Sequence, residues 1–185
     1  MYLFHNTNLK SLKNILKDGY LKSYSLLKKE GYNVSSGEAD GLYEENNFVF
    51  FSCVDNLNNN YEISSHIILY FNSKLLFNKT FYAATVHSPQ PDYLEEWKQD
   101  GKKMYKRKYN RYYKKYNDVL KKLLNYSINV LPNAKAFQQF QQIAVLNKVN
   151  LKELVCIEFK NKKDTTPQII NYINKYYPTV QIIIK

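Results

Sequence analysis

Residues 2–19, YLFHNTNLKSLKNILKDG, join a short apolar run to an amphipathic pattern with helical spacing. The run at residues 2–4 is typical of a strand. The apolar residues of the helical pattern are Leu9, Leu12, Ile15 and Leu16. Thr7 or Asn8 could cap this helix, and Gly19 could end it in a left-handed conformation. The chain is therefore predicted to open with a strand, a polar turn, a helix and a glycine stop.

Downstream of this opening, further apolar runs predict strands that alternate with single helices. The predicted strands cover 48–51, 66–71, 81–86, 142–146, 154–159 and 180–184. A last helix is expected to start at Thr166-Pro167 and run to Tyr177. Residues 28–47 are polar and contain three glycines, so we interpret them as a loop over a site or as poorly ordered. This order predicts a single mixed α+β domain covering residues 1–185.

The composition favours an anionic partner. The chain has 185 residues, and 27 Lys and Arg against 16 Asp and Glu give a net charge of +11. The two cysteines, Cys53 and Cys156, suggest reduced thiols rather than a disulfide framework. There is no leader-like segment and no apolar run long enough to span a bilayer, so an intracellular location without a membrane partner is expected.

Most of the excess charge lies in one segment. Residues 93–126 have a helical pattern, and Lys102–Lys122 contains ten Lys or Arg and one acid. An aromatic and apolar stripe at four–three spacing runs along one face of this predicted helical insertion. One interpretation is a surface helix docked by its tyrosines. The other is a helix that holds nucleic-acid phosphates through Lys106, Arg107, Lys108 and Arg111. A membrane-surface role is weaker, because the apolar face is Tyr rather than Leu or Phe.

Three short segments are candidate parts of one site. His5-Asn6-Thr7 follows the first strand, where a ring nitrogen and a hydroxyl two residues on would point to the same side and could hold ribose hydroxyls. Phe51-Ser52 ends another strand, where an aromatic ring could stack on a flat ring. Residues 138–142 are rich in glutamine and lead into a late strand. Each segment alone is also compatible with ordinary core or loop structure.

The order of these segments resembles the ADP-ribosyltransferase superfamily, and in particular small viral members and the DarT-type enzymes that modify DNA bases. The resemblance covers residues 2–159. It implies a split, mixed or antiparallel β-sheet with flanking helices and a cleft for NAD as co-substrate. It also implies that His5, Asn6 and Thr7 contact NAD and that Phe51 and Ser52 line the nicotinamide pocket.

The sequence departs from the family at the third motif. The family usually has a glutamate before the late strand, and the aligned residue here is Gln142, or Gln141 in another register. A carboxylate stabilises the oxocarbenium-like state and helps to take the acceptor's proton, whereas an amide has no charge and cannot act as a base. Gln142 and His5 are nevertheless the predicted catalytic residues. Three alternatives stay open: another acid such as Glu153 or Glu158, a weak transferase, or binding without catalysis.

The expected function is transfer of ADP-ribose from NAD to a macromolecule, with nucleic acid favoured over a host protein. The alternative is a catalytically weak or inactive module that binds nucleic acid or nucleotides, such as a viral or phage effector. No phosphate-binding loop, dinucleotide fingerprint or nucleophile elbow is present, and no metal site is expected.

Overall fold

The structure is a computed structural model, and it describes residues 2–34, 45–54, 57, 66–79, 81–84 and 142–185. The strands are β1 (Tyr2–Thr7), β2 (Tyr20–Lys22), β3 (Phe48–Val54), β4 (Ile67–Asn72), β5 (Phe81–Ala84), β6 (Gln142–Leu146), β7 (Lys148–Asn150), β8 (Leu154–Phe159) and β9 (Gln181–Ile184). The α-helices are α1 (Leu9–Asp18), α2 (Tyr24–Lys29) and α7 (Pro167–Tyr176), and short 3-10 turns lie at Glu45–Asn47, Ser73–Asn78, Leu151–Glu153 and Lys162–Asp164.

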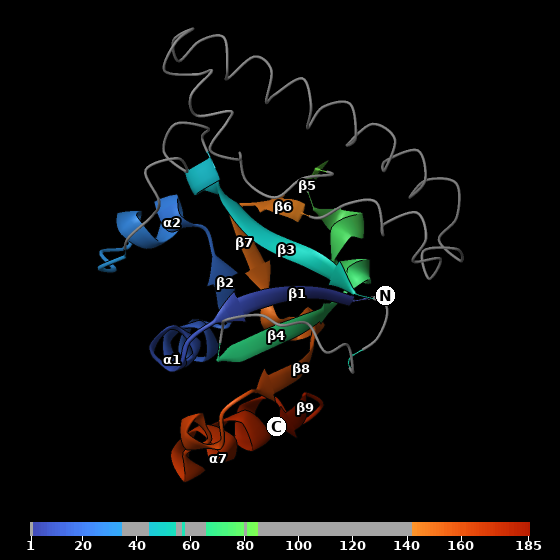
Figure 1. Cartoon of the computed structure of the whole chain (residues 1–185). Coiled ribbons are helices and arrows are strands. Elements are labelled where there is room, and N and C mark those ends of the chain that lie inside the picture. Colours follow the sequence, from blue (N-terminus) through green and yellow to red (C-terminus); the bar gives the residue numbers. More distant parts are fainter. Residues whose placement is uncertain (1, 35–44, 55–56, 58–65, 80, 85–141) are drawn as a thin grey trace, which may run out of the picture.

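A seven-stranded sheet in the order β5-β6-β3-β1-β4-β8-β9 forms the centre of the described fold (Figure 1). Its neighbouring strands are antiparallel except β8 and β9, which are parallel. A parallel pair needs a crossover, and α7 supplies it between β8 and β9. The mixed α+β class predicted from the sequence is confirmed.

Local sequence signals explain the ends of α1. The Asn8 side chain accepts a hydrogen bond from the Ser11 amide at 2.9 Å, which satisfies one of the free amides of the first turn. Gly19 has φ +71° and donates its amide to the Ile15 carbonyl at 3.0 Å. Glycine adopts this left-handed conformation at little cost, so the helix stops there and the chain turns into β2.

The small β2–β7 sheet is linked to its surroundings by backbone hydrogen bonds. Asn147, at φ +64°, turns the chain from β6 into β7, and its carbonyl accepts the Ser23 amide at 2.7 Å. The Leu151 amide donates to the Gly19 carbonyl at 3.1 Å. Asparagine tolerates this backbone region better than most residues. The two backbone hydrogen bonds, from Ser23 to Asn147 and from Leu151 to Gly19, hold the short strands next to the end of α1.

The main core lies on the face of the sheet that α1 and α7 cover. Leu12 and Leu16 from α1 and Ile169 and Ile173 from α7 join the inward side chains of the strands. A second cluster, which includes Phe4, lies on the other face. Both faces of the sheet therefore bury apolar side chains, which explains why β4 is a continuous apolar run.

Several boundaries differ from those predicted. β3 continues past the expected end at Ser52 to Val54, because it pairs with β1 over Tyr2–Phe4. The segment interpreted as a loop at 28–47 begins inside α2, and residues 45–47 form a 3-10 turn. The predicted basic helical insertion at 93–126 lies outside the described residues.

Candidate functional site

A cavity of about 240 Å³ lies at the end of β1, between that strand, α1, β2 and the segment that follows α2. We call it the β1 cavity. The predicted segment His5-Asn6-Thr7 forms part of its wall. The polar residues that other elements contribute include Ser11, Asn14, Asp18, Lys22 and Tyr32. Strand, turn and helix at the start of the chain thus supply one side of the cavity, and later segments supply the other.

His5 is held in one orientation by the neighbouring strand. Its Nδ1 lies 2.8 Å from the Phe50 carbonyl oxygen, which can only accept, so Nδ1 carries the proton. Burial lowers the pKa of His5, although the hydrogen bond to Phe50 acts in the opposite direction. The ring is therefore neutral at pH 7, and its Nε2 is an acceptor. The ring N–H that was expected to donate to a ligand donates to the Phe50 carbonyl instead. The other ring nitrogen, Nε2, offers a lone pair.

Phe51 and Ser52 lie on opposite faces of the sheet. Phe51 is 2% exposed and packs edge-on against Phe71, with ring centroids 5.5 Å apart. Its ring also contacts His5, at 5.9 Å between centroids, so Phe51 supports the histidine from the core. Ser52 pairs with Phe4, and adjacent strand residues point to opposite faces of a sheet. Neither residue is among the described residues that line the β1 cavity.

Gln142 is the first residue of β6, where its backbone pairs with Ala84. The next residue, Ile143, pairs with Phe51, whose ring contacts His5. Since β3 alone separates β6 from β1, position 142 lies about 10 Å from β1 across the sheet, at roughly 4.8 Å per strand. The sheet therefore places position 142 two strands away from β1.

The predicted phosphate contacts Lys106, Arg107, Lys108 and Arg111 lie outside the described residues. The two acids considered as substitutes for the family glutamate are described. Glu153 belongs to the 3-10 turn before β8, and Glu158 is fully buried in β8. Neither lines the β1 cavity as far as the described residues define it. Glu158 instead accepts a hydrogen bond from the Tyr70 hydroxyl at 2.9 Å.

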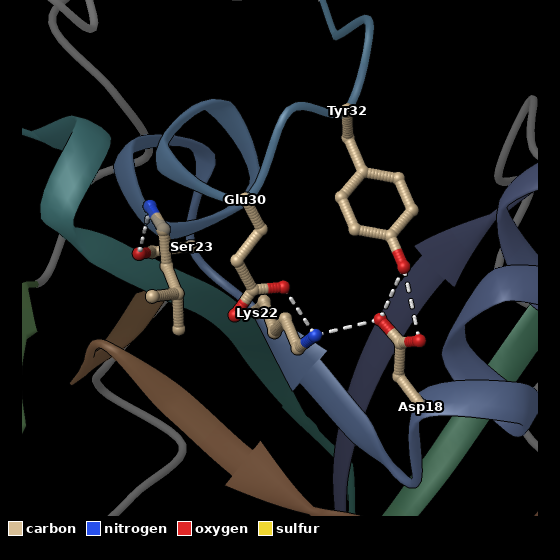
Figure 2. A network of polar contacts seen from close by, with 6 residues as sticks. Asp18, Lys22, Ser23, Glu30 and Tyr32 are labelled. Atoms are coloured by element: carbon tan, nitrogen blue, oxygen red, sulfur yellow. Dashed lines mark hydrogen bonds and ion pairs between the residues drawn. The ribbon is translucent and has the colours of Figure 1, made fainter.

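Sequence reasoning missed a polar network on the wall of the cavity (Figure 2). Lys22 Nζ donates to Asp18 Oδ2 at 2.7 Å and to Glu30 Oε2 at 2.5 Å. The Tyr32 hydroxyl donates to both oxygens of Asp18, at 3.0 and 2.8 Å. The network connects the end of α1, β2 and the segment after α2. The spacing of four residues between Asp18 and Lys22 could have indicated an ion pair in the sequence. Glu30 and Tyr32 lie in a stretch without helical or strand periodicity, so their contacts had no such signal.

The network keeps its charges under ordinary conditions. Burial alone would raise the pKa of Asp18, but hydrogen bonds from Lys22 and Tyr32 outweigh it and hold that pKa below its usual value. Burial would likewise lower the pKa of Lys22, and the two carboxylates raise it instead. The Tyr32 pKa is raised, first by its hydrogen bond to Asp18. The wall therefore presents a fixed carboxylate, an ammonium group and a neutral phenol.

These groups suit a neutral polyhydroxyl ligand. His5 offers an acceptor, Thr7 a hydroxyl and Asn14 an amide, while the ammonium of Lys22 lies between the carboxylates of Asp18 and Glu30. Pockets for drug-sized ligands measure roughly 300–1,000 Å³, so the β1 cavity is large enough for only part of a dinucleotide.

No helix in the described ranges is long and apolar enough to cross a bilayer.

The sequence matches no family model and no curated protein. Its fold, however, resembles solved structures of DarT. One is Thermus sp. 2.9 DarT in complex with ADP-ribosylated ssDNA, with 10% identity, a TM-score of 0.54 and coverage of 100% of this chain and 93% of that one. The same protein in complex with NAD+ gives 12% identity, a TM-score of 0.51 and coverage of 100% and 94%.

A third similar structure is Thermosipho africanus DarTG in complex with ADP-ribose. The identity is 10% and the TM-score 0.54, and the match covers 99% of this chain but 49% of that one. Because sheet order can persist after sequence similarity has disappeared, these matches concern the arrangement of elements. The part of the chain that the structure describes therefore has the fold of the DarT structures.

Proposed function

We propose that this protein binds NAD at the β1 cavity and transfers ADP-ribose to a nucleic acid, with DNA as the favoured acceptor. The observation that carries the proposal is a neutral, oriented His5 in the wall of a polar cavity, in a fold shared with DarT. The similar structures hold NAD+ and ADP-ribosylated ssDNA, and the net charge of +11 suits a polyanionic acceptor.

In this proposal the β1 cavity takes the nicotinamide ribose. The Nε2 lone pair of His5 accepts a hydrogen bond from a ribose hydroxyl, and Asn6 and Thr7 add polar contacts. Phe51 acts through His5 by holding its ring. The bond between ribose C1 and the nicotinamide nitrogen breaks, and nicotinamide leaves with the electron pair. A nucleophilic atom of the acceptor base then bonds to C1 and releases its proton to solvent.

Gln142 is the proposed catalytic residue on β6. Its amide can hydrogen-bond to a ribose hydroxyl or to the acceptor, but it cannot take a proton. Removal of one electrostatic contribution to a transition state typically costs about 10²–10³ in rate, so turnover is expected to be slow. The acceptor's own acidity and its position then determine the rate.

Nicotinamide release provides the direct test. Purified protein is incubated with NAD and a single-stranded oligonucleotide, and free nicotinamide and the oligonucleotide mass are measured. We expect release together with a mass gain of one ADP-ribose unit. A second assay records the thermal shift caused by NAD alone. No release with nucleic acid or protein mixtures, together with no thermal shift, would contradict the proposal.

A second candidate is a non-catalytic nucleic-acid-binding module on the same fold. The amide at position 142 favours it, because the charge that the chemistry uses is missing. This candidate predicts NAD-independent binding that weakens as salt rises. Replacement of Lys106, Arg107, Lys108 and Arg111 by Ala should weaken that binding. Binding that is unchanged at high salt would exclude this candidate.

A further inference from the structure

A second hollow, of about 420 Å³, lies on the other side of Tyr20 from the β1 cavity. It is bounded by β2, the turn from β7 into β8, and the end of α7 with the residues that follow it. Tyr176 and Tyr177 line it together with Tyr20, and we call it the tyrosine hollow. Tyr20 also lines the β1 cavity, so one residue borders both spaces.

One tyrosine of this hollow is exposed, and the other two are half-buried. Tyr176 is 55% exposed, and it is one of two large apolar side chains exposed among the described residues. Its ring lies 4.5 Å from that of Tyr172, which keeps it in place on α7. Tyr177 is fixed differently, because its hydroxyl donates to the Leu16 carbonyl at 2.6 Å. The hollow therefore presents the Tyr176 ring to solvent, with two half-buried tyrosines beside it.

Lysines accompany these rings. Lys148 Nζ lies 4.4 Å from the centroid of Tyr20, and Lys175 Nζ lies 5.0 Å from that of Tyr176. Lys152 is exposed and lines the hollow directly. No carboxylate occurs among its described lining residues. Exposed aromatic faces with cations beside them are the two features that single-stranded nucleic-acid sites combine, since bases stack and phosphates need charge.

We propose that the tyrosine hollow binds single-stranded nucleic acid. Bases stack on Tyr20 and Tyr176, and Lys148, Lys152 and Lys175 contact the phosphates. Because Tyr20 borders both spaces, a strand bound here lies next to the β1 cavity. The role of presenting an acceptor rests on the proposed function, whereas the binding itself requires no NAD.

Photocrosslinking locates the bound strand. The probe is a single-stranded oligonucleotide of about 10 nucleotides with 5-iodouracil in place of thymine, in the size range of known single-strand sites. The full chain is irradiated with this probe in the absence of NAD, and crosslinked peptides are mapped. We expect crosslinks at Tyr20 or Tyr176. Crosslinks confined to residues 93–126 would overturn the proposal.

Variants measure the contribution of each group. Tyr176→Leu should weaken binding about tenfold, since loss of one stacking partner has an effect of that order. The double variant Lys152→Gln/Lys175→Gln should reduce the salt slope of log affinity by about 1.4, or roughly 0.7 per lost phosphate contact. The matched control is Lys162→Gln/Lys163→Gln, which removes the same charge from an exposed turn outside the hollow. Equal losses in the control and the hollow variant would overturn the proposal.

The two proposals fail in different ways. The thermal shift caused by NAD without nucleic acid reports on the β1 cavity, while oligonucleotide binding without NAD reports on the tyrosine hollow. Binding that depends on Tyr176 in a protein that releases no nicotinamide would retain the hollow and remove the transferase. Nicotinamide release, together with oligonucleotide binding that does not change when Tyr176 is replaced, would retain the transferase and remove the tyrosine hollow.

Discussion

His5 lines the β1 cavity and is held to the backbone of β3 through Nδ1. Nδ1 donates to the Phe50 carbonyl, and the lowered pKa keeps Nε2 unprotonated near neutral pH. Protonation would replace an acceptor by a second donor. The protonation of the His5 ring therefore affects both the hydrogen bonding in the β1 cavity and the stability of the fold.

Acidification should reduce stability through His5. A histidine whose pKa is lower in the folded state binds its proton more readily when unfolded, so stability falls as pH drops below the ordinary value of 6.5. The His5→Asn variant keeps a donor for the Phe50 carbonyl but does not titrate. Urea unfolding at a series of pH values should show a smaller decline below pH 6.5 for this variant. An equal decline in both proteins would contradict the prediction.

Position 142 decides between a weakened transferase and a binding module. Gln142→Glu should raise nicotinamide release by up to about 10²-fold if the missing carboxylate limits the rate. Gln142→Ala should abolish release if the amide itself contributes. The measurement is single-turnover nicotinamide release at saturating NAD, with circular dichroism as a check on folding. No effect of either substitution would leave only the binding module.

Among the elements, the segment after α2 depends on a few polar contacts for its position. No residue of α2 is buried, yet Glu30 and Tyr32 contact Lys22 and Asp18 on neighbouring elements. Short helices contribute little stability of their own, so these contacts hold the segment against the cavity. We expect Tyr32 to position this segment through its contact with Asp18.

Tyr32→Phe tests this role, because it removes two hydrogen bonds and keeps the ring. We expect a small loss of stability, seen as a lower Tm, because the phenol no longer donates to the Asp18 carboxylate. The KM for NAD should rise more than kcat falls. Tyr24→Phe at the start of α2 is the matched control and should change neither. A fall in kcat at constant KM would argue against a positioning role.

Some elements were predictable and others were not. The α1 boundaries followed from Asn8 and Gly19, because caps are local chemistry. β2 and β7 were missed, since three residues are too few to show a period of two. They form because Asn147 and Gly19 turn two distant segments into pairing range, which no single window of sequence contains.

At the scale of the whole molecule, an ion pair between a buried carboxylate and a partly exposed lysine joins β8 to the residue after β9. Glu158 is fully buried and Lys185 Nζ lies 2.9 Å from its Oε1, while Tyr70 donates to Oε2. Burial, the hydrogen bond to Glu158 and its charge together raise the pKa of Tyr70 far above its usual value, and burial raises the pKa of nearby Cys156 to about 12. Both groups therefore stay protonated around the carboxylate.

Lys185→Gln should destabilise the protein because it leaves a buried carboxylate without its cation. Such losses reach about 3–5 kcal/mol for fully buried pairs, and about 1–2 kcal/mol is expected here because the lysine is partly exposed. The double variant Glu158→Gln/Lys185→Gln should recover part of the loss. Denaturant unfolding of the single and double variants measures the coupling. Additive losses would show that the pair does not interact.

The amino-acid sequence by itself determined the α+β class, the opening strand and helix, and the candidate segment His5-Asn6-Thr7, because periodicity and capping act over short distances. Only the tertiary structure placed Tyr20 between two hollows and brought Asp18 and Tyr32 together on one wall. It also put Ser52 on the face opposite His5, because β3 pairs with β1 in one particular register. Register and long-range contacts depend on which strands meet, and that choice minimises the energy of the whole fold rather than of any one segment.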